Sequence, residues 1–221
     1  MASELAKYWS LESSRLFLNH GSFGACPDFV IAEQRKWQDL MEQEPVQFFE
    51  ELMPDLLLKS RKALGAFLSC PADDLALVSN ATSGVNTVLR SLHFEEGDEI
   101  LVPNHAYQAC RNSIDFVAQR WGAKVVEVAI PFPIEGPQIV TDLMKSACTP
   151  HTKLVMIDTV TSPTGLRMPF EELTAHFEEN GVEVLLDAAH GIGMIPLNLE
   201  KLGASYVTSN CHKWLCAPKG S

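Results

Sequence analysis

The sequence predicts an α/β fold in which helices cover both faces of a mostly parallel sheet, preceded by an N-terminal helical arm. From residue 75 onward, short β-branched runs alternate with longer amphipathic runs, which is the pattern of repeated β-α-β units. Runs such as 154–158 and 182–187 are largely apolar and end in an aspartate, as expected of strands buried on both faces whose ends emerge at a rim. The predicted strands are residues 75–79, 99–103, 124–130, 153–160, 182–188 and 204–209.

Helices are predicted between these strands at residues 84–92, 106–121, 138–147, 169–180 and 199–202. The residue composition is different before residue 75. Residues 29–53 are rich in Glu, Gln, Trp and Phe with Pro45 interrupting, and residues 54–68 fit a further helix. We therefore predict an arm with its helices over residues 1–65 and one large domain over residues 66–221. Right-handed crossovers would place the carboxyl ends of the parallel strands on one rim.

Composition excludes several classes of function. With 221 residues and 46% hydrophobic content, the chain can bury a substantial core. A net charge of −11 opposes binding to nucleic acid, which requires clustered Lys and Arg. No apolar run approaches the roughly 20 residues that span a bilayer, so we expect a soluble protein without a membrane partner. The six cysteines lack a C-x-x-C pair and no leader-like segment is present, which favours a reducing cytoplasm.

Lys213 and Asp187 form the most informative pair of residues. Asp187 ends an apolar strand-like run, and Lys213 comes just after the next one, so both are expected at the carboxyl edge of the sheet, where open α/β folds bind ligands. A lysine amine can form a Schiff base with the aldehyde of pyridoxal 5'-phosphate, and an aspartate can hold the pyridine nitrogen protonated. The pair therefore suggests pyridoxal phosphate chemistry. Asp158 ends a run in the same way, although a capping role explains it equally well.

Four short motifs occur in a characteristic order: residues 19–24 (NHGSFG), 80–84 (NATSG), 162–165 (SPTG) and 212–220 (HKWLCAPKG). With them the chain resembles the aminotransferase class V family, in particular its isopenicillin N epimerase-like branch. The resemblance implies the large domain of fold type I, pyridoxal phosphate as cofactor, an amino acid or derivative as substrate, and a homodimer. It leaves epimerase, aminotransferase and C–S lyase chemistry open. Family members continue into a smaller C-terminal domain, which we expect this chain to lack.

The resemblance also implies roles for individual residues. Lys213 would carry the Schiff base and move the Cα proton, and Asp187 would pair with the ring nitrogen. His190 and Ser162 would contact the phenolic oxygen of the cofactor, whereas Asn210 and His212 would complete the phosphate site.

Residues 80–84 fit a phosphate site independently, because they follow a strand-like run and begin a helix. Ala81, Thr82 and Ser83 would present N–H and O–H groups there, although an ordinary helix cap would use the same residues. The resemblance implies that Tyr107 stacks on the cofactor ring, with His105 as the competing candidate; plain packing of the tyrosine is a further alternative.

Near the N-terminus, the resemblance implies that Asn19, His20 and Gly21 line the substrate carboxylate. The glycines of this motif could instead mark only a tight turn.

Three other interpretations remain open. Zinc ligation by His190, His212, Cys211 and Asp187 is disfavoured because no metal-ligand spacing is present, so no metal is expected. Cys211 or Cys216 could act as the nucleophile of a cysteine desulfurase-like enzyme, but burial as small hydrophobic residues fits both better. A chain ending soon after Lys213 could also be a catalytically inactive interaction or regulatory module that keeps the fold.

Overall fold

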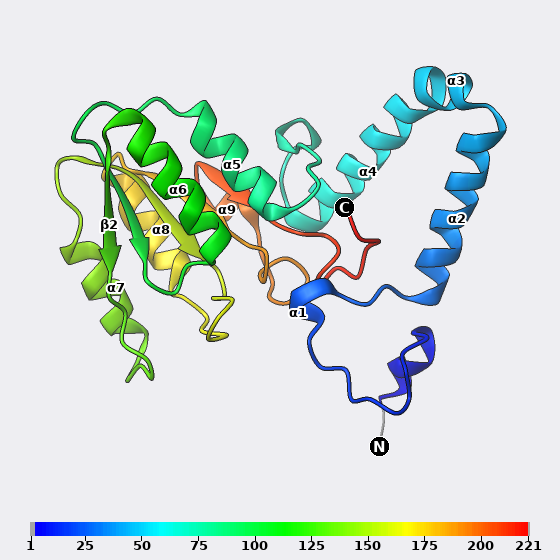
Figure 1. Cartoon of the computed structure of the whole chain (residues 1–221), viewed down its shortest axis with the longest axis horizontal. Coiled ribbons are helices and arrows are strands. Elements are labelled where there is room, and N and C mark those ends of the chain that lie inside the picture. Colours follow the sequence, from blue (N-terminus) through cyan, green and yellow to red (C-terminus); the bar gives the residue numbers. More distant parts are fainter. Residues whose placement is uncertain (1–2, 221) are drawn as a thin grey trace. The chain divides into compact units, whose positions relative to one another are not determined.

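The computed structural model describes residues 3–220 (Figure 1). These residues form two compact units. The sheet unit comprises residues 80–197 and 201–210, and the helical unit comprises the residues up to Ser79 together with residues 198–200 and 211–220.

The sheet unit is built on five parallel strands in the order β2-β1-β3-β4-β5. The strands are β1 (Glu99–Pro103), β2 (Lys124–Val128), β3 (Thr152–Asp158), β4 (Glu183–Asp187) and β5 (Tyr206–Thr208). The helices that accompany them are α5 (Ala81–Ser91), α6 (Gln108–Trp121), α7 (Pro137–Ser146) and α8 (Phe170–Glu179), and the short α9 (Leu199–Leu202) precedes β5. The predicted α/β architecture with a parallel sheet is confirmed.

Both faces of the sheet are buried, and alternate residues of each strand point to opposite faces. Figure 1 shows α5 and α6 in front of the sheet. On this face, α5 and α6 pack against strand residues that include Ile100, Met156 and Leu185. On the other face, α7 and α8 pack against residues that include Val155 and Leu186. Continuous apolar runs in the sequence therefore form strands covered on both sides.

The strand order creates a topological switch point between β1 and β3. The chain leaves β1 through α6 on one face of the sheet and reaches β3 through α7 on the other face. The loops after these two strands therefore diverge at the carboxyl edge, and such a divergence is where open α/β sheets bind ligands.

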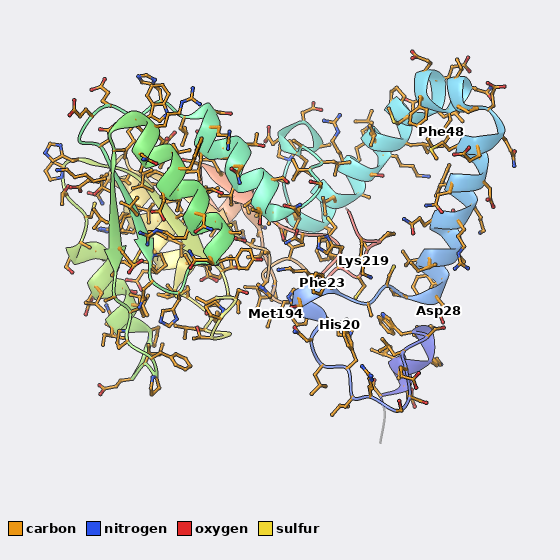
Figure 2. The ribbon with its side chains drawn as sticks, in the orientation of Figure 1. His20, Phe23, Asp28, Phe48, Met194 and Lys219 are labelled. Carbon is orange, nitrogen blue, oxygen red and sulfur yellow. The ribbon has the colours of Figure 1, made fainter. Side chains whose placement is uncertain are left out.

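The helical unit consists mainly of α2 (Asp28–Gln43), α3 (Pro45–Gln47), a π-helical turn η2 (Phe48–Leu52) and α4 (Met53–Leu68). Its shorter elements are η1 (Glu4–Tyr8), α1 (His20–Phe23) and η3 (Ala72–Asp74). Figure 2 shows Phe48 at the bend between α2 and α4. Within the described residues, α2 and η2 bury no side chain, and α4 buries only Gly65 and Leu68.

The predicted strand at residues 75–79 is wrong. This segment forms no strand ladder within the described residues, and Leu77 remains 50% exposed. A β-prone sequence needs a neighbouring strand, and none of the five described strands pairs with it. The helix predicted from residue 84 starts earlier, at Ala81, because Asn80 caps it. No helix in residues 3–220 has the length and apolarity needed to cross a bilayer.

Candidate active site

Polar side chains gather at the carboxyl ends of three adjacent strands of the sheet unit. Asp187 ends β4 and is 3% exposed. In the register of the sheet it lies between Asp158 on β3 and Thr208 on β5. Strand alternation places both carboxylates on the face covered by α5 and α6, because Met156 and Leu185 belong to that face. The sequence prediction that Asp187 lies at the rim is consistent with this position.

The two carboxylate oxygens of Asp187 have different donors. Oδ1 accepts a hydrogen bond from the Ala189 N–H at 2.9 Å, and the Cys110 thiol on α6 donates to Oδ2 at 3.4 Å. Burial raises the pKa of Cys110 far above its ordinary value of 9.0, and the negative charges of Asp187 and Asp158 raise that pKa further. The thiol therefore stays protonated and can act as a neutral donor at physiological pH.

The amino end of α5 is anchored to the end of β5. Asn210 Oδ1 accepts from the Ala81 N–H at 2.8 Å, and the Thr208 hydroxyl donates to the Ala81 carbonyl at 3.0 Å. Asn80 Oδ1 accepts from the Ser83 N–H at 2.8 Å. The Ala81 N–H, predicted to face an anion, is therefore used within the protein. The first turn of α5 also carries the N–H of Thr82 and the hydroxyls of Thr82 and Ser83, at the positive end of the helix dipole.

A hydrogen-bonded pair connects the loops after β1 and β3 at the switch point. The ring of His105 is 6% exposed, with Nδ1 2.9 Å from Thr164 Oγ1 and Nε2 3.1 Å from the Ile130 carbonyl. Because a carbonyl can only accept, we infer that Nε2 carries a proton. Tyr107 precedes α6 and is 45% exposed. His105 is thus fixed by two hydrogen bonds, whereas the Tyr107 ring is accessible.

Two further predicted residues lie on loops at the same edge of the sheet. Ser162 is exposed in the loop after β3, and His190 is partly buried in the turn after β4. Gly191 allows this turn to lie against the end of β3, since a Cβ there would approach Thr159 Oγ1 to 2.7 Å. Close packing of the turn thereby fixes the backbone next to His190.

The lysine segment belongs to the helical unit and forms a compact turn. Cys216 N–H donates to the Lys213 carbonyl at 3.3 Å, and Ala217 N–H donates to the Cys211 carbonyl at 3.1 Å. His212 and Lys213 are partly buried.

The turn that holds Asn19, His20 and Gly21 packs on the lysine segment. Gly24 has a φ of +50°, and a Cβ there would lie 2.0 Å from the His212 carbonyl oxygen. Asn19 Oδ1 accepts from the Ser22 N–H at 3.1 Å, and His20 Nδ1 accepts from the Ala25 N–H at 3.2 Å. The structure therefore brings the predicted substrate-binding turn and the predicted cofactor lysine into one unit.

The predicted site residues divide between the two units. The sheet unit holds Ala81, Thr82, Ser83, Tyr107, Ser162, Asp187, His190 and Asn210, and the helical unit holds Asn19, His20, Gly21, His212 and Lys213. Along the chain, only Cys211 and His212 separate Asn210 from Lys213. Residues 3–220 contain no cluster of His, Cys, Asp and Glu suited to a metal ion.

Sequence reasoning missed three residues of this edge: Cys110, Thr164 and Thr208. Each forms a hydrogen bond with a candidate residue that is distant in the sequence. A small polar residue on the apolar face of a predicted helix was the available signal for Cys110.

Comparison of the sequence with models of protein families identifies the family of this chain. The family model described as Aminotransferase class-V matches residues 43–221. The chain belongs to the aminotransferase class-V family. It is 34% identical over 217 residues to a probable chloroplastic L-cysteine desulfhydrase of Arabidopsis thaliana, an alignment that covers 91% of this chain and 46% of the relative. It is 32% identical over 218 residues to the isopenicillin N epimerase of Amycolatopsis lactamdurans, covering 96% of this chain and 54% of the relative.

Solved structures of similar fold include a complex of the cystine C–S lyase C-DES with cysteine persulfide, at a TM-score of 0.84 and 21% identity over 94% of this chain and 56% of that one. The Escherichia coli cysteine desulfurase CsdA matches with a TM-score of 0.83 and 21% identity, over 98% of this chain and 55% of that one. The predicted fold class, the large domain of fold type I, is confirmed. This class-V chain spans about half the length of the curated relatives it matches.

Proposed function

We propose that this chain forms the pyridoxal phosphate site of an enzyme that acts on an amino acid or an amino-acid derivative. The observation that carries the proposal is the buried Asp187 carboxylate, oriented by two donors at the same sheet edge as the capped amino end of α5. A buried carboxylate and a helix amino end at one sheet edge suit a ligand with a basic ring nitrogen at one end and a phosphate at the other. Membership of the class-V family supports the same cofactor.

The residues present fit this cofactor part by part. Asp187 would hold the proton on the ring nitrogen, because an adjacent negative charge favours the protonated form. The first turn of α5, with the Thr82 and Ser83 hydroxyls, would bind the phosphate together with Asn210 and His212. Tyr107 would lie on the ring, and His190 and Ser162 would donate to the phenolic oxygen.

Lys213 would hold the cofactor through its amine and later move the Cα proton of the substrate at Nζ. When bound, pyridoxal phosphate supplies the electron sink that lowers the cost of removing that proton. The turn of Asn19, His20 and Gly21, which packs on the lysine segment, would line the substrate carboxylate. Similarity to an L-cysteine desulfhydrase and an isopenicillin N epimerase supports C–S lyase or epimerase chemistry on the substrate.

Borohydride reduction after addition of pyridoxal phosphate tests the proposal. We expect one reduced adduct per chain, located by mass spectrometry of the peptide that contains Lys213. Lys213→Ala should abolish the adduct, whereas Lys219→Ala, in the same segment but exposed, should leave it intact. A folded chain that gives no adduct, or an adduct that survives Lys213→Ala, would overturn the assignment. Asp187→Asn should keep Lys213 reactive but weaken cofactor binding.

We also propose that the protein is a cytoplasmic homodimer. Phe29 on α2, Val46 on α3 and Phe49 on η2 expose apolar side chains, and large exposed apolar patches favour association. All six cysteines are free thiols, which suits a reducing compartment. Sedimentation equilibrium would give the mass in solution, and a monomer at all concentrations would refute the dimer. An inactive module is less well supported, since the similar curated proteins carry the names of enzymes.

A further inference from the structure

Cys110 occupies an unusual position for a cysteine on an apolar helix face. Its neighbours on α6, such as Ile114 and Val117, pack into the core against the sheet. The thiol itself is fully buried and donates to Asp187 Oδ2 at 3.4 Å. Core packing alone would be served by alanine or valine, neither of which can donate a hydrogen bond.

The contact adds a second element to the support of the Asp187 carboxylate. Ala189 N–H donates to Oδ1 from the turn after β4, and the Cys110 thiol donates to Oδ2 from α6. One donor on each oxygen, from two separate elements, restricts rotation of the carboxylate plane. The surroundings keep the thiol a donor, because burial and the charges of Asp187 and Asp158 oppose its ionisation. The Thr82 side chain also interacts with the sulfur, which connects Cys110 to the first turn of α5.

We propose that Cys110 is a positioning residue for Asp187: its thiol donates to Oδ2 and thereby holds the carboxylate in one orientation. The orientation is a property of the protein alone, and only its consequence for pyridoxal phosphate rests on the proposed function. A thiol suits the task because it is a weak donor. It fixes the carboxylate while leaving more negative charge on Oδ2 for a protonated ring nitrogen than a hydroxyl would.

The S–H stretching band of the chain without cofactor tests the contact directly. Cys110→Ala identifies the Cys110 band by difference, and Cys148→Ala, which removes a partly buried thiol elsewhere in the sheet unit, is the matched control. We expect the Cys110 band at a lower frequency than the other thiol bands, since donation to a carboxylate weakens the S–H bond. Asp187→Asn should move it to higher frequency. A Cys110 band that Asp187→Asn leaves in place, in a variant whose circular dichroism matches the parent, would overturn the proposal.

Cofactor affinity tests the consequence of the contact. Cys110→Ala should raise the dissociation constant of pyridoxal phosphate on the order of tenfold, as for the loss of one hydrogen bond to a charged group. Cys110→Ser should recover most of the affinity, and Cys148→Ala should change nothing. Equal affinity of Cys110→Ala and the parent would refute the role toward the cofactor. If the parent chain binds no pyridoxal phosphate, the proposed function fails, while the S–H band still decides whether Cys110 orients Asp187.

Discussion

Helices α2 and α6 have nearly equal lengths and comparable amphipathic patterns, yet their surroundings differ completely. Of the 14 residues of α6, five are buried, among them Cys110 and Ile114. None of the 16 residues of α2 is buried in the described part of the chain. An amphipathic pattern therefore predicts that a helix has an apolar face, but the rest of the fold decides whether anything covers that face.

The same contrast holds for the two units as wholes. Strands β1, β3 and β4 of the sheet unit place fully buried side chains on both faces of the sheet. The helical unit exposes large apolar side chains, including Phe29, Val46 and Phe49. We conclude that the stability of the described chain resides mainly in the sheet unit, and that the apolar residues of α2, α3 and η2 are available for association.

Truncating one phenylalanine in each unit provides the largest test of this contrast. Phe177 on α8 is fully buried, whereas Phe49 on η2 is 46% exposed. Phe177→Ala should cost about 3–5 kcal/mol of unfolding free energy, because it removes buried contacts and leaves a cavity. Phe49→Ala should change it by less than about 0.5 kcal/mol. Hydrogen exchange measures both effects, at the β3 and β4 amides for Phe177→Ala and at the α4 amides for Phe49→Ala. An equally large effect of Phe49→Ala would show that the helical unit is packed in solution.

Gly24 is the position where the helical unit should be most sensitive. Gly24→Ala forces a side chain onto a backbone with φ of +50° and into the His212 carbonyl. We expect a cost of about 1–3 kcal/mol from the backbone alone, with the overlap adding to it. Gly97→Ala is the matched control, since its φ is +94° but nothing lies within 4 Å of the added Cβ.

Adduct formation at Lys213 separates the backbone strain, which Gly24→Ala and Gly97→Ala share, from the overlap with the His212 carbonyl. Gly24→Ala should displace the lysine segment and reduce the adduct strongly, whereas Gly97→Ala should leave labelling normal. Undisturbed labelling in Gly24→Ala would mean that the turn does not hold the lysine segment.

The sequence predicts the sheet better than it predicts the contacts at its edge. The strand predicted at residues 99–103 has the same bounds in the structure. Its continuous apolar run can be buried on both faces only between two layers of helices. Residues 75–79 carry the same kind of signal, but pairing depends on a neighbour that local sequence does not encode. Asp187 was predicted from its position at the end of an apolar run. The contacts of Cys110 with Asp187 and of Gly24 with His212 join residues distant in sequence, so no local pattern could show them.

Two substitutions at Asn210 test the stability of the sheet unit separately from its binding of the cofactor. Its Oδ1 accepts from the buried Ala81 N–H, so Asn210→Ala should cost on the order of 1 kcal/mol, like the loss of a helix cap. Asn210→Asp keeps an acceptor at the same place and should preserve stability, but its negative charge would repel a phosphate at the start of α5. We expect both variants to bind pyridoxal phosphate weakly and only Asn210→Ala to unfold at lower urea. If Asn210→Asp binds the cofactor as well as the parent, no phosphate occupies this position.

The smallest predicted effect is a loss of stability in alkaline solution that originates in the sheet unit. Burial, followed by the charges of Asp187 and Asp158, raises the pKa of Cys110 above its ordinary value of 9.0. The unfolded thiol therefore releases its proton at a pH where the folded thiol retains it, so this contribution is complete below about pH 9 and declines above it. The loss from this one group should be about 0.8 kcal/mol at pH 9.5.

Urea denaturation between about pH 8 and pH 10 measures the slope of unfolding free energy against pH, which Cys110→Ala should reduce. Cys26→Ala, in the helical unit, should reduce it less, because burial raises the pKa of Cys26 while the charge of Lys219 lowers it. Equal slopes for Cys110→Ala and the parent would mean that Cys110 ionises in the folded chain, and its thiol could then no longer donate to Asp187 above that pH.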